Sequence, residues 1–324
     1  MRYRNFLIIP FLILSCAAAV ARPDKRKSSK SKSDDQQVER SSPADSRVEF
    51  SACLESGNIT VHGWDKKEVR ARVTDGMAID FQPAGASAAA PPKELTLMMA
   101  GRRGAMKSCV SFGALELYVP RDATVNLQSG DAEISVSDVG KVRIETQNGA
   151  VTVERASRGV EVSTLGGGIS VSNSKGSIKV HSVGGGIDLD SLAPSLAGDV
   201  CEAITVGGEI SVTQVSHAQV NLQTVGSDVT FKSALARGGR YSFQTISGDL
   251  RVTLPADSSF RVNATLQGEI DTDFPLKIST ASPELPNNSK KHRVIPQLVE
   301  GRFGTGDALI TLSTFNGSVQ LRKE

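Results

Sequence analysis

From Arg121 to the C-terminus the chain repeats one pattern of apolar and polar positions. Each copy has a short stretch of alternating apolar and polar residues, a tight bend, and a second alternating stretch. The first apolar residue after each bend serves as a reference position, and successive reference positions lie 17 to 23 residues apart as far as Ile270. They are Ile134, Val151, Ile169, Ile187, Ile210, Val229, Leu250, Ile270 and, after an interruption, Val319.

Other positions keep the same register. A serine or threonine stands five residues before every reference residue, and glycine stands two residues before seven of the nine. An apolar residue stands four residues before the last seven and two residues after eight of them. Glycine in the bend is expected to permit a positive φ, and the hydroxyl group is expected to bond the nearby backbone.

This register predicts the fold class. Alternation with a period of two indicates strands with one buried face. A unit of two short strands cannot bury that face alone, whereas copies stacked about 4.8 Å apart place like residues over like. We therefore expect an all-β, β-solenoid-like stack of two-strand repeats, or a flattened two-sheet relative of one, over residues 121–324. A Pro-rich loop over 279–301 is expected to interrupt the last coil.

The residues before the repeats predict three further segments. Residues 1–21 carry two arginines, an apolar run and a closing Ala-Val-Ala, which is the pattern of a signal peptide. Residues 22–46 are basic and polar with almost no apolar side chains, so a disordered linker is expected there. Residues 47–120 are expected to form an N-terminal β subdomain. Its expected elements are a hairpin or strand-turn-strand over Val48–Val61 and strands near Glu68–Val73, Glu94–Met99 and Cys109–Val119.

The N-terminal segment leaves two alternatives open. Cys16 ends the sequence Ile-Leu-Ser-Cys, which is similar to a bacterial lipobox, so lipidation of Cys16 is an alternative to cleavage after Ala21. Several basic residues follow the apolar run and oppose translocation, which keeps an uncleaved membrane anchor as a further alternative.

Charge and cysteine content narrow the function classes. The chain has 37 basic and 35 acidic residues, so no overall field attracts nucleic acid, and we expect no nucleic-acid partner. In an exported protein Cys53 and Cys109, both in the first subdomain, are candidates for a disulfide. Cys201 occupies an inward position of the repeat and is expected to be a buried thiol.

Two acidic groups are candidate sites. Glu209, Asp228, Asp249 and Glu269 each precede a reference residue, and stacking would align them as weak candidates for a divalent cation; a solvated turn position is the preferred interpretation. Asp188 and Asp190 form a period-two pair that a polysaccharide lyase or glycosidase could use, although no Arg or His accompanies them in the sequence. The four histidines lack metal-ligand spacing, and no cofactor is expected.

Several motifs resemble a known family. They are Gly-Asn-Ile-x-Val-x-Gly-Trp-Asp-x-x-Glu-Val at 57–69, Tyr-Val-Pro-Arg-Asp at 118–122, the repeated Thr-x-x-Gly-x-Ile-x-Val, and Gly-Thr-Gly-Asp-Ala-Leu-Ile-x-Leu-Ser-Thr at 304–314. Together they resemble the bacterial putative-adhesin family of β-strand-repeat proteins, a domain of unknown function in exported and envelope proteins. The resemblance implies a right-handed, solenoid-like all-β domain without established catalytic residues.

The sequence therefore favours a noncatalytic, adhesin-like scaffold that is exported to the periplasm, the outer membrane or the extracellular space. Its polar face is expected to bind an unidentified envelope or extracellular protein or glycan. Membrane contact is expected only through the signal peptide or a lipid on Cys16. The alternatives are a carbohydrate-active solenoid enzyme and an envelope-stress sensory or regulatory domain.

Overall fold

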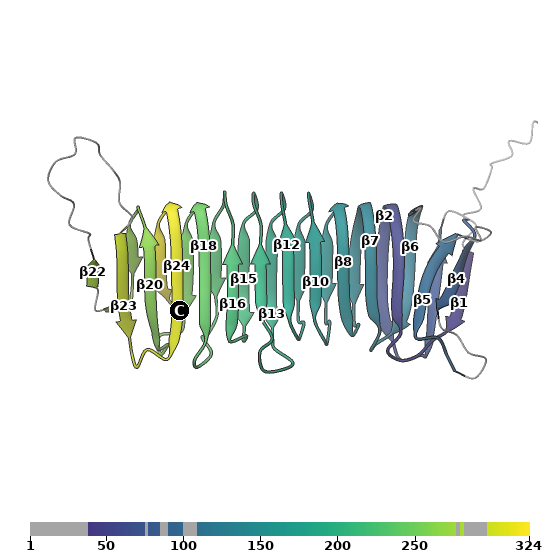
Figure 1. Ribbon diagram of the computed structural model, residues 1–324, viewed down its shortest axis with the longest axis horizontal. Coiled ribbons are helices and arrows are strands. Elements are labelled where there is room, and N and C mark those ends of the chain that lie inside the picture. The colour runs from purple at the N-terminus through teal and green to yellow at the C-terminus, as the bar shows by residue number, and fades with distance from the viewer. Residues whose placement is uncertain (1–37, 75–76, 85–89, 100–108, 277–278, 282–296) are drawn as a thin grey trace, which may run out of the picture. The chain divides into compact units, whose positions relative to one another are not determined.

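The computed structural model describes residues 38–74, 77–84, 90–99, 109–276, 279–281 and 297–324 of the chain. All of them belong to one compact unit. Strands joined by turns make up this unit, and no helix occurs in the part of the chain that is described. The expected all-β class is confirmed (Figure 1).

Two rows of parallel strands build the unit. The first row runs β7 (Thr124–Ser137), β8 (Lys141–Asn148), β10 (Val160–Thr164), β12 (Ile178–Ser182), β14 (Cys201–Ile204), β16 (Gln219–Gln223) and β18 (Arg240–Ser247). The second row begins in the last part of β7 and runs β9 (Val151–Glu154), β11 (Ile169–Ser172), β13 (Ile187–Leu192), β15 (Ile210–Val215), β17 (Val229–Lys232) and β19 (Leu250–Leu254). Each bend carries the chain from the first row to the second.

The pairing register confirms the repeat. Ile187 pairs with Ile169 on one side and with Ile210 on the other, so reference residues stack on reference residues. Along each strand, buried and exposed residues alternate, and the buried apolar residues of both rows meet in one core. Phe260 and Val262 are also fully buried, but the bend before Ile270 is one residue shorter than that of the neighbouring coil, because Thr265 pairs with Ser313 and Ile270 with Val319. The structure is therefore a stack of β-solenoid-like coils.

Both ends of the stack depart from chain order. The C-terminal strands β24 (Ala308–Asn316) and β25 (Val319–Lys323) lie between the coil of β18 and β19 and the coil of β20 (Phe260–Leu266) and β21 (Ile270–Thr272) (Figure 1). At the other end β2 (Glu49–Trp64) lies between β6 (Val110–Pro120) and β7, parallel to both. The domain boundary expected after residue 120 thus falls inside one continuous stack, and Val48–Val61 forms a coil rather than a hairpin.

The disordered linker predicted for residues 22–46 is wrong from Val38 onward. Residues 38–43 form β1 (Val38–Pro43), which pairs antiparallel with β3 (Glu68–Val73). Glu39 there forms ion pairs with Arg70 and Arg72 at 3.4 and 3.0 Å. The segment is ordered by backbone pairing at a sheet edge, which needs few apolar side chains and so leaves little trace in composition. The remaining N-terminal strands are β4 (Ile79–Ala84) and β5 (Glu94–Met99).

The loop predicted over 279–301 also needs correction. Its ends are strands, β22 (Ser279–Ala281) and β23 (Gln297–Phe303), and residues 282–296 lie outside the described residues. β23 pairs antiparallel with β20 and so covers the edge of the last coil. Phe303 packs on Phe260 and Phe274, with ring centroids 5.9 and 5.0 Å apart. The β20 edge is thereby paired within the chain, which protects it from pairing with another chain.

In six of the coils the hydroxyl of the serine or threonine before the bend links neighbouring coils. The Ser182 hydroxyl donates to the Gly167 carbonyl of the preceding coil at 3.0 Å and accepts from the Gly185 N–H at 2.9 Å. Thr205 repeats both bonds with Gly185 and Gly208, at 3.0 and 3.3 Å. The expected hydroxyl–backbone bond is confirmed, and the same hydroxyl also joins one coil to the next.

The glycine of the bend has a different role from the expected one. Among the seven glycines two residues before a reference residue, only Gly149 has a positive φ. A Cβ added at Gly185 or Gly208 would stand 2.0 Å from the carbonyl oxygen of the corresponding glycine in the preceding coil. That carbonyl is the one to which the serine or threonine hydroxyl donates. Glycine is required because the coils approach each other closely, not because of backbone conformation.

Candidate functional site

The outward residues of the second row of strands form a straight line of polar side chains, which we call the polar row. Each member follows a reference residue and pairs in register with the next member. Because the strands are parallel and in register, the side chains recur at intervals of about 4.8 Å. The polar row consists of Ser135, Thr152, Ser170, Asp188, Ser211 and Thr230.

A groove of about 560 Å³ runs beside the middle of the polar row. Ala150, Gly168 and Gly186, which precede the reference residues here, form part of its lining together with Thr152, Ser170, Asp188 and Ser211. The hollow follows from sequence, because three successive coils carry only alanine or glycine at the position where Glu209 extends a long side chain in the next coil. The groove can offer hydroxyl and carboxylate groups to a ligand that lies across several strands.

The two aspartates singled out in the sequence lie on this surface. Asp188 is exposed and is paired with Ser170 and Ser211 on the neighbouring strands. Asp190 is paired with Ser172 and Thr213, and its Oδ2 accepts the Ser191 hydroxyl at 2.9 Å. The neighbouring strands thus surround both carboxylates with hydroxyl groups. Such an arrangement suits hydrogen bonding to a ligand.

The four acidic residues considered for a cation do not form one continuous row. Because β25 lies between β19 and β21, Ser318 stands between Asp249 and Glu269 in the stack. Asp249 accepts the Ser318 N–H at 2.8 Å, and this bond lowers the pKa of Asp249. Arg251 binds Asp228 and Asp249 at 2.9 and 3.1 Å. Among the described residues, no group of three or more His, Cys, Asp or Glu is arranged to hold a metal ion.

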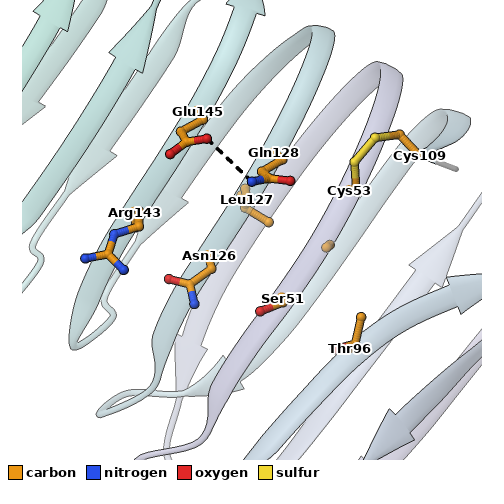
Figure 2. Close-up of a pocket in the computed structure, with 10 residues that line it drawn as sticks. Ser51, Cys53, Thr96, Cys109, Asn126, Leu127, Gln128, Arg143 and Glu145 are labelled. Atoms are coloured by element: carbon orange, nitrogen blue, oxygen red, sulfur yellow. Dashed lines mark hydrogen bonds between the residues drawn. A yellow bond between two sulfur atoms is a disulfide. The ribbon is translucent and has the colours of Figure 1, made fainter. Parts of the chain in front are cut away.

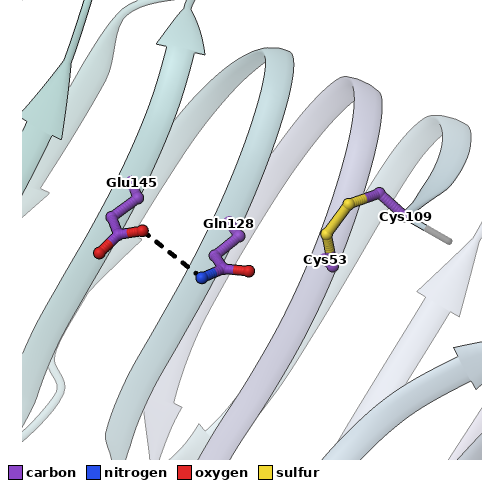
Figure 3. The surroundings of a disulfide bond; sticks show 4 residues. All are labelled: Cys53, Cys109, Gln128 and Glu145. Carbon is purple, nitrogen blue, oxygen red and sulfur yellow. Dashed lines mark hydrogen bonds between the residues drawn. A yellow bond between two sulfur atoms is a disulfide. The ribbon is translucent and has the colours of Figure 1, made fainter. Parts of the chain in front are cut away.

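Cys53 and Cys109 are joined by a disulfide, with Cα atoms 4.5 Å apart, which ties β2 to the residue before β6. Figure 3 shows that Gln128 and Glu145 lie on the next strands, and the Gln128 amide donates to Glu145 at 3.4 Å. A hollow of about 620 Å³ adjoins the disulfide and extends past Asn126 and Arg143 (Figure 2). Cys16, the other candidate cysteine, and the predicted signal peptide lie outside the described residues, and Cys201 is a fully buried free thiol, as expected.

Comparisons with known proteins place the chain in a family. The Toastrack DUF4097 family model matches residues 115–321, nearly two thirds of the chain. The chain belongs to this family. The match begins within β6 and ends within β25, so it spans every coil from β7 onward and leaves out β1 to β5.

Other comparisons add little to the Toastrack assignment. A solved structure of a putative cell adhesion protein from Clostridium sporogenes aligns with 9% identity and a TM-score of 0.27, over 89% of this chain and all of that one. A likeness at that level supports no statement about function. No curated protein sequence matches the chain. None of the described residues forms a helix long and apolar enough to cross a membrane.

One histidine of this Toastrack protein is wholly buried. His217 Nε2 lies 2.8 Å from the Gly176 carbonyl and therefore carries the proton, because a carbonyl oxygen can only accept. Its Nδ1 has no hydrogen-bond partner among the described residues. Burial lowers the pKa of His217, although the Gly176 bond and the charge of Asp199 act in the opposite direction. By contrast, His62 and His181 bond Ser137 and Glu202 nearer the surface, and His292 is not among the described residues.

We expect this histidine to make stability depend on pH. The unfolded chain binds the proton at a pKa of about 6.5, above that of the folded protein. The free energy of unfolding should therefore be constant above that pH and fall as the pH drops toward the lower folded pKa, with a limiting slope of about 1.4 kcal/mol per unit. Urea denaturation between pH 8 and pH 5 measures this pH dependence of the free energy of unfolding. The slope should be reduced in His217→Gln, whose amide can still donate to Gly176, and identical slopes would contradict the assignment.

The bends of the Toastrack coils also carry a row of exposed apolar residues, whose exposure could not be predicted from the sequence. The apolar residue four positions before the reference residue is exposed in six adjacent coils, and we call this row the apolar ridge. The sequence shows these residues in register but not their direction, since an apolar register usually indicates a core position. In the last coil of the stack the bend is one residue shorter than in the coil of β24 and β25, so Leu266 faces inward and is buried. The ridge consists of Leu165, Val183, Val206, Val225, Ile246 and Phe315.

Proposed function

We propose that the protein is an exported, noncatalytic scaffold whose polar row and adjacent groove bind a glycan of the cell envelope or extracellular space. The observation that carries the proposal is the alignment of Thr152, Ser170, Asp188 and Ser211 along one groove. Equally spaced donors and acceptors suit a polymer whose hydroxyl groups also recur, because each sugar can make a similar set of hydrogen bonds.

Three observations support export and a binding role. The N-terminal sequence has the pattern of a signal peptide. Disulfides such as Cys53–Cys109 persist mainly in oxidising compartments outside the cytosol. The parallel strands hold the polar row on a rigid, fully hydrogen-bonded surface, so little conformational entropy is lost when a ligand is bound.

Binding to purified peptidoglycan sacculi and to a panel of immobilised polysaccharides tests the proposal. Ser170→Arg places a long side chain in the middle of the groove beside Asp188, and it should reduce binding at least about tenfold, or 1.4 kcal/mol. Ser242→Arg is the matched control, since Ser242 is an outward serine of β18 in the other row of strands. Equal binding by both variants, or binding by the wild type to envelope proteins alone, would refute the glycan site.

The alternative function, that of a carbohydrate-active enzyme, is also tested with polysaccharides and peptidoglycan. Pectin, alginate and peptidoglycan fragments are incubated with the wild type and with the double variant Asp188→Asn, Asp190→Asn. A scaffold should leave all fragments intact in both cases. Turnover that the double variant abolishes would replace the scaffold by an enzyme.

A further inference from the structure

The apolar ridge has no explanation within the fold of one chain. Its six side chains, each 42–59% exposed, stand in adjacent coils and form one contiguous row. Single exposed apolar residues are ordinary on protein surfaces, whereas a contiguous patch marks an interaction site. The backbone beneath is paired, because the N–H groups of Val206 and Val225 donate to the carbonyls of Val183 and Val206, both at 3.3 Å. The ridge is thus a fixed array of side chains and not an open strand edge.

The rows on both sides of the ridge lack strong charges. Only His181 can become charged there, and it is bonded to Glu202 at 3.1 Å. Depletion of charged residues characterises the buried centre of protein interfaces. The row on one side is Gly166, Gly184, Gly207, Gly226, Ser247 and Asn316, and the row on the other is Ser163, His181, Ile204, Gln223, Gln244 and Ser313.

Three glycines beside the ridge are not required by the fold. A Cβ added at Gly184, Gly207 or Gly226 would have its nearest neighbour at 3.4 to 3.6 Å, which is ordinary contact, and none of the three has a positive φ. They differ in this respect from Gly185 and Gly208, where the preceding coil leaves no room. Bare backbone beside an exposed apolar row allows a partner to approach closely.

We propose that the apolar ridge is a self-association surface, on which a second copy of the chain packs its own ridge about a two-fold axis between Val206 and Val225. Val206 of one copy then faces Val225 of the other, and Leu165 faces Phe315. Identical surfaces most often associate in this two-fold manner. The proposal is independent of the proposed glycan site, because the polar row lies beyond the bend on the second row of strands.

Charge, area and side-chain size favour a second copy. An uncharged surface meets its own copy without repulsion between like charges. The six side chains expose on the order of 500 Å² per copy, so pairing buries about 1,000 Å², at which specific interfaces begin. Stacked strands twist, so two stacks that cross are closest at the axis and separate toward the ends. The ridge has valines at its centre and Leu165, Ile246 and Phe315 toward its ends, where the larger side chains fill the wider gap.

The same surface is poorly suited to a membrane. Surfaces that lie on anionic lipid combine apolar residues with Lys, Arg, Trp or Tyr. Beyond the row of glycines, the next long side chains are the carboxylates of Glu209, Asp228 and Asp249, of which the last two are paired with Arg251. A negative headgroup would be repelled there.

Sedimentation equilibrium of the exported chain tests the proposal. The wild type should form a concentration-dependent dimer. The double variant Val206→Lys, Val225→Lys should raise the dimer dissociation constant at least about 100-fold, because four lysines meet at the axis, while its melting temperature at low concentration stays unchanged. The control Thr152→Lys, Thr230→Lys adds the same charge on the polar row and should remain dimeric.

Cysteine cross-linking tests the orientation. A mixture of Val206→Cys and Val225→Cys proteins should form disulfide-linked dimers faster than either protein alone, because only the mixture brings unlike positions together across the axis. A monomeric wild type, a dimer that persists in the double lysine variant, or faster cross-linking of each protein alone would overturn the proposal. So would a monomer that binds phosphatidylcholine vesicles through the ridge.

Discussion

Replacing Ile187 with aspartate is expected to unfold the stack. Ile187 is only 2% exposed and packs between Ile169 and Ile210 of the neighbouring coils. An aspartate there must either bury an unpaired charge or open the core to water, and either costs roughly 4 kcal/mol or more. A loss of that size is a large part of the free energy of unfolding of a typical domain. Urea denaturation and thermal melting followed by circular dichroism give the change in the free energy of unfolding.

Thr230→Asp is the matched control. Thr230 faces outward on β17, paired with Ser211 on one side and Arg251 on the other, so the new carboxylate stays in water beside a positive charge. Its effect should be within about 0.5 kcal/mol of zero. Similar losses in both variants would mean that the inward and outward registers have been assigned incorrectly.

The core of the fold could be predicted because consecutive coils stack on one another through its middle. The positions of Ile169, Ile187 and Ile210 in the sequence are then also their positions in space, and a repeat count gives the register. This reasoning fails at the ends. Val319 is the last reference residue of the chain, yet it stacks between Leu250 and Ile270. Periodicity shows which residues are equivalent, but not which equivalent residues touch when the chain returns to fill an inner position.

The candidate site, too, could be predicted from the sequence only in part. The polar row follows directly from the register, since a residue beside a buried reference residue must face outward. The groove beside it depends on the coincidence of Ala150, Gly168 and Gly186 in adjacent coils, which could have been read from the aligned copies. The apolar ridge could not be placed, because hydrophobicity alone does not distinguish an exposed bend from a core position. The direction of Val206 is set by the bend, and the bend is set by contacts between coils.

Those contacts explain why hydroxyl groups and glycine recur together. The Thr205 hydroxyl donates to the Gly185 carbonyl, and the same carbonyl occupies the space that a side chain at Gly208 would need. A larger residue at 208 would push the carbonyl away and break the bond that joins the coils. The two positions therefore constrain each other, and each coil transmits the constraint to the next.

Gly208→Ala is accordingly expected to destabilise the protein by about 3 kcal/mol, since overpacking against backbone cannot be relieved by a rotamer change. Gly207→Ala is the control on the adjacent residue, where the nearest atom to a new Cβ is the Val183 oxygen at 3.6 Å. It should be neutral or stabilising by up to about 1 kcal/mol, because alanine restricts the unfolded chain. Urea midpoints at equal m-values and one protein concentration measure both changes. If the two variants lose the same stability, close approach of the coils is not the reason that glycine occupies the bend.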